Sequence, residues 1–162
     1  MAVENWAEAL GLAETIKELN SQERASPVIG RTVYRLRMTA NLGSNNIDAA
    51  LSDALSWSRL ESGGTIVPLL RVASHLCRTE QFERAVAVFE DVRDTLDAYP
   101  VSVAEFAEAL WHTGRREEAA AAADRVGDDA PSAARLRLRA LRSLIGSSVA
   151  SLDRSKVDAD RP

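Results

Sequence analysis

Apolar side chains recur every three or four residues along most of the chain, which is the spacing of one face of an α-helix. Short clusters of Ser, Asn, Gly, Thr and Pro interrupt this pattern, for example at Gly43-Ser44-Asn45 and at Thr113-Gly114. Alternating β-branched stretches, which indicate strands, are almost absent. The pattern therefore predicts an all-α protein of about eight helices joined by short turns.

We expect a single domain over residues 1–152 and a polar, disordered tail over residues 153–162. The turn signals divide the domain into an N-terminal helix over 1–20, a divergent helix pair over 27–61, helix pairs over 66–98 and 100–131, and a terminal capping helix over 131–152. Pro27 and Pro68 fall in the first turn of their helices, where proline is tolerated. Thr65 is placed to cap the helix that contains Pro68.

An internal repeat is the strongest signal in the sequence. Shifting the chain by 34 residues aligns the segment that begins at Ile66 with the segment that begins at Pro100, without a gap. Identical residues then meet at several positions: Val67 with Val101, Ala73 with Ala107, Leu76 with Leu110, Thr79 with Thr113, and Ala85 with Ala119. A period of this length in a helical chain is typical of stacked helix pairs.

The repeated segment, about residues 66–131, resembles the tetratricopeptide repeat family. Each copy carries a large, a small and a large apolar residue on its first helix and a small residue early in its second: Val72, Ala73, Leu76 and Ala85, then Phe106, Ala107, Leu110 and Ala119. Gly114 occupies the turn of the second copy, where the first has Glu80. Residues 27–61 fit the first-helix pattern poorly around Arg37. A helical bundle with accidental similarity is the alternative.

The resemblance implies a right-handed α-α superhelix in which the first helix of each pair lines a concave groove. Carried over position by position, the partner-binding residues are Leu70, Arg71, Ser74, Cys77 and Arg78 in the first copy, and Ala104, Glu105, Glu108, Trp111 and His112 in the second. The terminal helix then covers the apolar end of the stack. The N-terminal helix, which includes Trp6, forms either an opposite cap or a homodimer contact.

Three of the groove residues suggest specific binding chemistry. A partly exposed Trp111 would supply a large apolar contact, although it can equally pack against a neighbouring helix. Arg71 and Arg78 are seven residues apart, so they project from one side of a helix and could hold a carboxylate. The alternative for the arginines is an ordinary solvated face.

The net charge of −4 and the pI of about 5.3 argue against a nucleic-acid partner. The basic residues are almost all arginine, which we attribute first to genome base composition, as in many bacterial proteins. Arg135, Arg139 and Arg142 share one face of the terminal helix, with Arg137 nearby. This patch could attract an acidic partner, a lipid head group or RNA, or simply be a solvated flank.

Catalytic patterns are not found. His75 and Cys77 are two residues apart on a helix, which is not the spacing of metal ligands, and His112 is isolated. No glycine-rich phosphate loop or nucleophile elbow occurs. Glu105 and Glu108 are interpreted as a solvated helix face. We therefore expect no enzyme, no cofactor, no metal and no small-molecule substrate.

The start of the chain lacks a secretion signal, and no apolar run has the length of a membrane span, so we expect a cytoplasmic protein. The predicted function is that of a non-catalytic adaptor, assembly factor or chaperone-like subunit that holds a partner protein or peptide in the groove. Two alternatives remain open at this point: a self-assembling structural protein, which would be a homo-oligomer, and an RNA-associated helical repeat.

Overall fold

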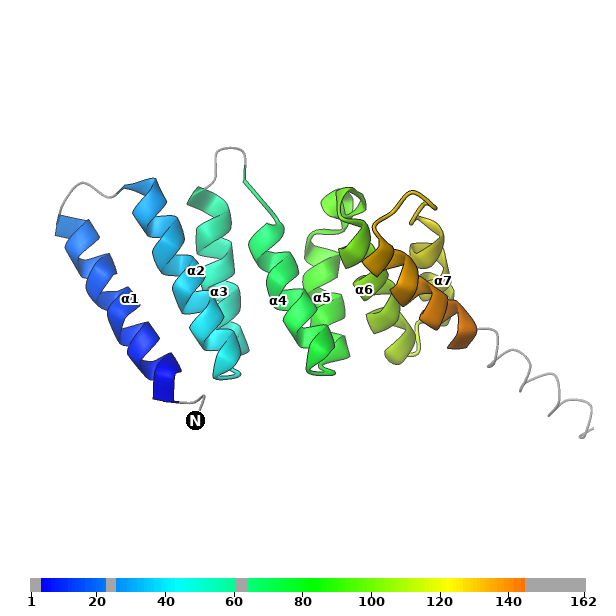
Figure 1. Cartoon of the computed structure of the whole chain (residues 1–162), viewed down its shortest axis with the longest axis horizontal. Coiled ribbons are helices and arrows are strands. Elements are labelled where there is room, and N and C mark those ends of the chain that lie inside the picture. The colour runs from blue at the N-terminus through cyan, green and yellow to red at the C-terminus, as the bar shows by residue number, and fades with distance from the viewer. Residues whose placement is uncertain (1–3, 23–25, 61–63, 145–162) are drawn as a thin grey trace, which may run out of the picture. The chain divides into compact units, whose positions relative to one another are not determined.

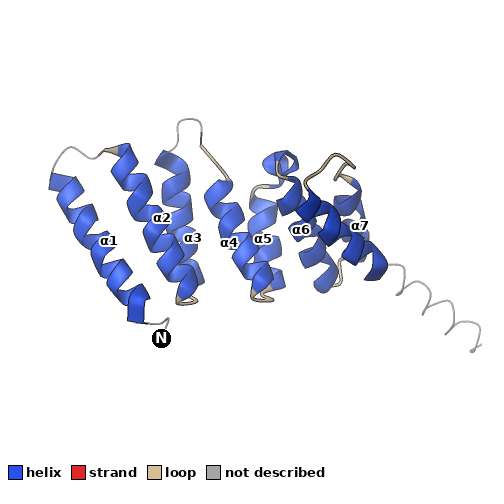
Figure 2. Cartoon of the chain, in the orientation of Figure 1, coloured by secondary structure: helices blue, strands red, loops and turns tan. Residues whose placement is uncertain are grey.

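The computed structural model describes residues 4–22, 26–60 and 64–144, and within these ranges it is all-helical, without a strand (Figure 2). The predicted all-α class is confirmed. No helix in the described ranges combines the length and the apolar character needed to cross a membrane. The chain divides into two compact units, Met1–Val92 and Arg93–Pro162, and each is described by itself.

The first unit contains five α-helices in sequence order (Figure 1). Their bounds are α1 Glu4–Gln22, α2 Pro27–Gly43, α3 Ile47–Leu60, α4 Val67–Arg78 and α5 Phe82–Asp91. Each helix packs on the next, and α2 also contacts α4 across α3. The two helices α2 and α4 therefore lie beside each other on the same neighbour.

The second unit begins with a short 3-10 helix, η1 (Arg93–Ala98), followed by α6 (Pro100–His112), α7 (Arg116–Asp124) and a helix over residues 132–144. The helix α6 packs on both η1 and α7. The sequence did not predict η1, which buries Leu96 completely. The rest of the predicted capping helix, residues 145–152, and the predicted tail, residues 153–162, lie outside the described residues.

Proline marks the start of the first helix in each pair. Pro27, Pro68 and Pro100 occupy the first or second position of α2, α4 and α6, where the amide that proline lacks would have no helical acceptor. The predicted role of Thr65 is confirmed in part: its Oγ1 accepts a hydrogen bond from the Val67 amide at 3.3 Å, although Ile66 is the N-cap residue.

The same turn joins the two helices of every pair. Its central residue has a left-handed backbone in all three cases: Asn45 (φ 57°), Glu80 (φ 58°) and Gly114 (φ 80°). These residues are 35 and 34 positions apart. In each turn the next amide donates to the carbonyl five residues earlier, at 2.7 Å, 2.9 Å and 2.9 Å, which is the Schellman arrangement. The sequence repeat thus corresponds to a repeated local structure, and it extends to the divergent pair.

A buried alanine follows each turn by five residues. Ala50, Ala85 and Ala119 are completely buried. A methyl side chain at this position lets the second helix approach the first closely, as the sequence comparison predicted for Ala85 and Ala119. Ala50 has the same spacing from its turn, so the α2–α3 pair shares this feature with the two later pairs.

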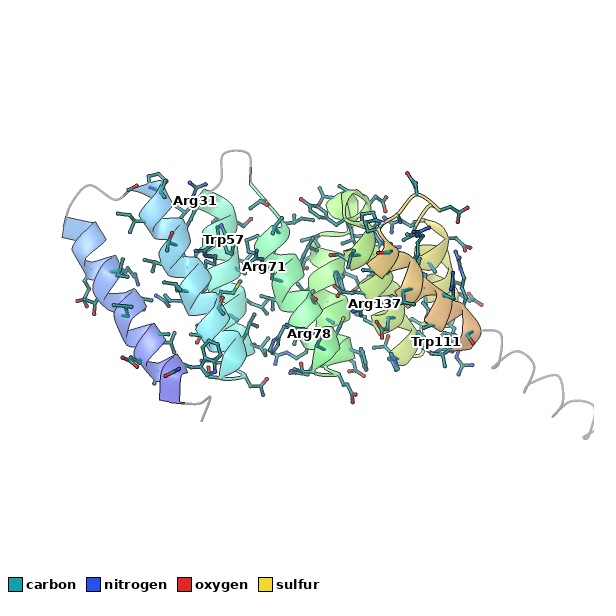
Figure 3. The ribbon with its side chains drawn as sticks, in the orientation of Figure 1. Arg31, Trp57, Arg71, Arg78, Trp111 and Arg137 are labelled. Atoms are coloured by element: carbon teal, nitrogen blue, oxygen red, sulfur yellow. The ribbon has the colours of Figure 1, made fainter. Side chains whose placement is uncertain are left out.

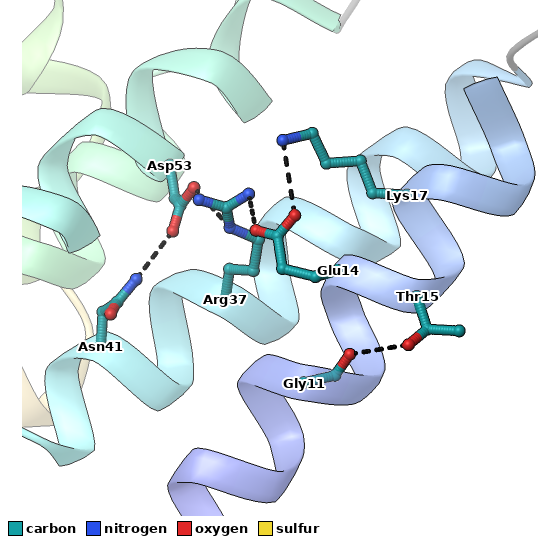
Figure 4. A network of polar contacts seen from close by, with 7 residues as sticks. All are labelled: Gly11, Glu14, Thr15, Lys17, Arg37, Asn41 and Asp53. Atoms are coloured by element: carbon teal, nitrogen blue, oxygen red, sulfur yellow. Dashed lines mark hydrogen bonds and ion pairs between the residues drawn. The ribbon is translucent and has the colours of Figure 1, made fainter.

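The α2–α3 pair differs from the others in its interior. Counted from the turn, Arg37, Asn41 and Asp53 occupy the positions of Val72, Leu76 and Val88 in the α4–α5 pair. Arg37 Nε lies 3.1 Å from Asp53 Oδ1, and Asn41 Nδ2 donates to Asp53 Oδ2 at 2.9 Å (Figure 4). Arg37 Nη1 also lies 2.5 Å from Glu14 Oε1 of α1. Polar side chains therefore fill positions that are apolar in the other pairs, which is why this pair fits the repeat pattern poorly.

The helix α1 is docked on α2 through Trp6. The indole of Trp6 fills the space beside Gly43, where a Cβ atom would overlap the ring. Only Ala13 is completely buried among the described side chains of α1, so the apolar contact is narrow. The helix α1 packs on its own chain through α2.

Candidate protein-binding surface

The helix α4 is strongly amphipathic, and its exposed side carries three of the predicted groove residues. Arg71 and Arg78 are exposed and Ser74 is partly exposed. Leu70 and Cys77 lie on the buried side, with exposed fractions of 6% and 7%. The prediction that Arg71 and Arg78 project from the same side of a helix is confirmed, whereas Leu70 and Cys77 offer little surface to a partner.

Arg71 is held in place by an aromatic ring. Its guanidinium carbon lies 5.5 Å from the centre of the Trp57 ring of α3, within the range of a cation–π contact. Figure 3 shows the two side chains between α3 and α4, with Arg78 at the other end of α4. This contact orients the guanidinium without neutralising its charge, so Arg71 remains able to bind an anion.

The charges on α2 and α4 are all of one sign. The helix α2 carries Arg31, Arg35 and Arg37, and α4 carries Arg71 and Arg78; neither contains an aspartate or a glutamate. The neighbouring helices are acidic on balance: α1 has four glutamates and one lysine, and α5 has three acidic residues and one arginine. Arg37 is paired with Asp53 and Glu14, so the exposed basic charge of these two helices comes from Arg35, Arg71 and Arg78, in a chain whose net charge is −4.

Apolar side chains are exposed beside these arginines. On α2, Val28 is 60% exposed and Leu36 is 36% exposed, and Arg35 is exposed between them in sequence. The helices α2 and α4 both pack on α3 and also contact each other, so they are neighbours within the first unit. We call the surface formed by Val28, Arg35 and Leu36 of α2 with Arg71 and Arg78 of α4 the α2/α4 face.

The only other titratable side chain on the exposed side of α4 is His75. Burial lowers the pKa of this imidazole below its usual value, and the nearby Arg78 charge lowers it further. His75 is therefore neutral at neutral pH and adds an uncharged hydrogen-bonding group beside Arg78.

The predicted groove residues of the second unit are engaged with other side chains. Arg137, on the helix over residues 132–144, lies 3.5 Å from Glu105 and 2.6 Å from Glu108 (Nη2 to Oε1 and Nη1 to Oε2). Glu105 is only 5% exposed, so its interpretation as part of a solvated face was wrong. The error arose because sequence spacing on α6 does not reveal that a distant arginine is placed to pair with it.

Trp111, His112 and Ala104 have different surroundings. Trp111 is half-buried, and the Arg116 guanidinium carbon lies 5.1 Å from its ring centre. His112 is exposed, and Ala104 is completely buried. Among these three residues, Trp111 and His112 retain surface that a partner could contact.

The arginine patch predicted on the terminal helix is also present. Arg135, Arg139 and Arg142 are exposed and line a hollow of about 370 Å³ together with Asp128. Arg142 Nη2 lies 3.9 Å from Asp124 Oδ1. Acidic side chains accompany these arginines, so the patch has less unbalanced basic charge than the α2/α4 face.

Sequence reasoning found the α4 part of this surface but missed the α2 part. The signal was present, because residues 27–43 contain three arginines and no acidic residue. It was not used because only the structure places α2 beside α4. In the described ranges, no group of three or more His, Cys, Asp or Glu side chains could hold a metal ion. Comparison of the chain with protein-family models, with curated proteins and with solved structures gives no match.

Proposed function

We propose that this chain is a non-catalytic protein-interaction module that holds a segment of a partner protein on the exposed side of its first helices. The observation that carries the proposal is the pair Arg71 and Arg78, exposed on one side of α4 and without an acidic side chain on the same helix. Arginine is enriched at binding hot spots, and its guanidinium group forms bidentate hydrogen bonds with carboxylates.

We infer further that the helix pairs are tetratricopeptide repeats that stack into a right-handed superhelix. Three features support this: the 34-residue sequence repeat, the three equivalent left-handed turns, and the buried alanine after each turn. Helix pairs of this kind bury their apolar faces only by stacking, and the stack presents its first helices as a binding surface.

The test is affinity capture from a lysate of the native cell, with mass-spectrometric identification. The wild-type chain is compared with Arg71→Ala/Arg78→Ala and with a matched control, Arg135→Ala/Arg139→Ala, which removes two exposed arginines elsewhere. Circular dichroism establishes that all three are folded. The proposal expects a protein that is captured by the wild type and the control and lost with the α4 variant. Loss with the control alone would move the site to the terminal helix and overturn the proposal.

A further inference from the structure

We infer that the α2/α4 face binds an acidic amphipathic helix of a partner protein. The carboxylates of that helix would pair with the arginines of the face, and its apolar side chains would contact Val28 and Leu36. This inference rests on the proposed function and names the chemistry of the partner. It follows from three separate observations: the unbalanced charge of the two helices, the apolar side chains exposed among the arginines, and the way the chain already packs an acidic helix of its own.

Charge is the first observation. Arg35, Arg71 and Arg78 are exposed on helices that contain no acidic residue. Complementary charge is the main source of specificity and of fast association in protein interfaces. An acidic segment satisfies these three guanidinium groups, whereas a basic segment brings like charges together. The partner segment must therefore carry carboxylates on the side that faces α4.

The exposed apolar side chains are the second observation. Val28 and Leu36 lie two helical turns apart on α2, and both keep a large exposed fraction, 60% and 36%. Burying such side chains is favourable, because apolar surface is removed from water. A small anion or the phosphate backbone of a nucleic acid would leave them exposed. A segment with apolar side chains next to its carboxylates covers both kinds of residue.

The third observation comes from α1. This helix is itself acidic, with four glutamates and one lysine. It packs on one side of α2, where Glu14 pairs with Arg37 (Figure 4). Trp6 also lies against Gly43 of α2. The same helix α2 presents Arg35 and the apolar side chains Val28 and Leu36 on its exposed side. A second helix with the chemistry of α1 therefore fits the α2/α4 face.

Selection from a peptide library tests this inference without knowledge of the natural partner. Phage that display random peptides of about 16 residues, about four helical turns, are selected on the full chain. The same library is selected on Arg35→Glu/Arg71→Glu/Arg78→Glu and on the control Arg93→Glu/Arg135→Glu/Arg139→Glu. The control changes the charge by the same amount at exposed arginines outside the face. Circular dichroism and thermal unfolding establish that all three proteins are folded.

The expected result is enrichment of peptides rich in both Asp or Glu and large apolar residues, on the wild type and on the control but not on the charge-reversed face. A synthetic copy of such a peptide should bind the charge-reversed face at least about tenfold more weakly in fluorescence anisotropy. Enrichment of peptides without acidic residues that still depend on the face would overturn the inference and leave the proposed function intact. No enrichment on the wild type, or binding of a single-stranded RNA oligonucleotide through the same arginines, would overturn both.

Discussion

Arg37 and Asp53 form an ion pair, 3.1 Å from Nε to Oδ1, at two positions that are apolar in each of the other helix pairs. The equivalent residues are Val72 and Val88 in the α4–α5 pair, and all four are buried or partly buried. Burial raises the pKa of the Asp53 carboxyl, although the Arg37 charge and the Asn41 hydrogen bond oppose the rise. The pair therefore stabilises the fold less than its short distance suggests.

Removing Arg37 alone should be strongly destabilising. Arg37→Val leaves the Asp53 carboxylate buried without its cation, which we expect to lower the free energy of unfolding by about 3 kcal/mol. The triple change Arg37→Val/Asn41→Leu/Asp53→Val reproduces the apolar interior of the α4–α5 pair and should be at least as stable as the wild type. Urea denaturation at neutral pH measures both. A triple variant as unstable as the single one would show that the apolar equivalence is wrong.

The same pair predicts a pH effect of known sign. A raised pKa means that native Asp53 binds a proton more readily than the unfolded chain, so ionisation of this group opposes folding above its native pKa. Loss of the Arg37 charge raises that pKa further. The stability deficit of Arg37→Val should therefore shrink as the pH falls toward 3.8, the ordinary value. A deficit that stays constant on acidification would contradict this account.

The left-handed turns differ in how well their residues suit them. Glu80 has φ 58°, a conformation that costs a residue with a side chain about 1–2 kcal/mol relative to glycine. Glu80→Gly should raise the free energy of unfolding by about 1 kcal/mol, and Gly114→Ala should lower it by a similar amount. Asn45→Gly should change it little, because asparagine tolerates this conformation. Thermal unfolding ranks the three; an unstabilised Glu80→Gly would indicate that Glu80 gains something else at the turn.

The packing of α1 on α2 depends on Gly43, which has no side chain to exclude the Trp6 indole. Gly43→Ala places a methyl group where the Trp6 indole now lies, so Trp6 must move away from α2. With Trp57 and Trp111 replaced by phenylalanine, the emission of Trp6 should shift to longer wavelength in this variant. Gly11→Ala on α1 is the control, since a methyl group there meets nothing within 4 Å. It should stabilise the chain by about 0.5–1 kcal/mol and leave the emission unchanged.

Two arginines on one helix should respond differently to the same change. Arg137→Leu removes one ion-pair partner of buried Glu105 and should lower the free energy of unfolding by about 2 kcal/mol. Arg139 is exposed, so Arg139→Leu should stay within about 0.5 kcal/mol of the wild type. Adding Glu105→Gln to Arg137→Leu removes the buried charge and should recover part of the loss. Equal losses for the two arginines would contradict the pairing.

Periodicity and turn chemistry were enough to predict the helices, because each amphipathic segment ends at a recognisable turn. They failed where a side chain depends on a distant partner. Arg37 made the α2–α3 pair hard to recognise, because a charged residue at a normally apolar position does not fit the repeat pattern. Only the structure shows that Asp53 pairs with it. The 3-10 helix η1 had no comparable signal, because its buried anchor is a single residue, Leu96.

For the same reason, the sequence indicated the α4 residues of the candidate site but not its α2 residues. Arg71 and Arg78 share a helix, so their spacing alone places them on one side. Arg35 lies on α2, which contacts α4, and a contact between helices that are not consecutive leaves no local mark in the sequence. The burial of Glu105 likewise depends on Arg137, which is 32 residues away in the chain.

A charge swap tests most directly the claim that the α2/α4 face recognises an acidic helix. One peptide selected on the wild type is made in two forms, as selected and with every Asp and Glu changed to Lys. Binding of both forms is measured by fluorescence anisotropy to the wild type and to Arg35→Glu/Arg71→Glu/Arg78→Glu. The account predicts that the acidic form binds the wild type and the lysine form binds the charge-reversed protein, each at least about tenfold more tightly than the mismatched combination. Equal binding of the acidic form to both proteins would contradict it, because the arginines of this face would then take no part in recognition.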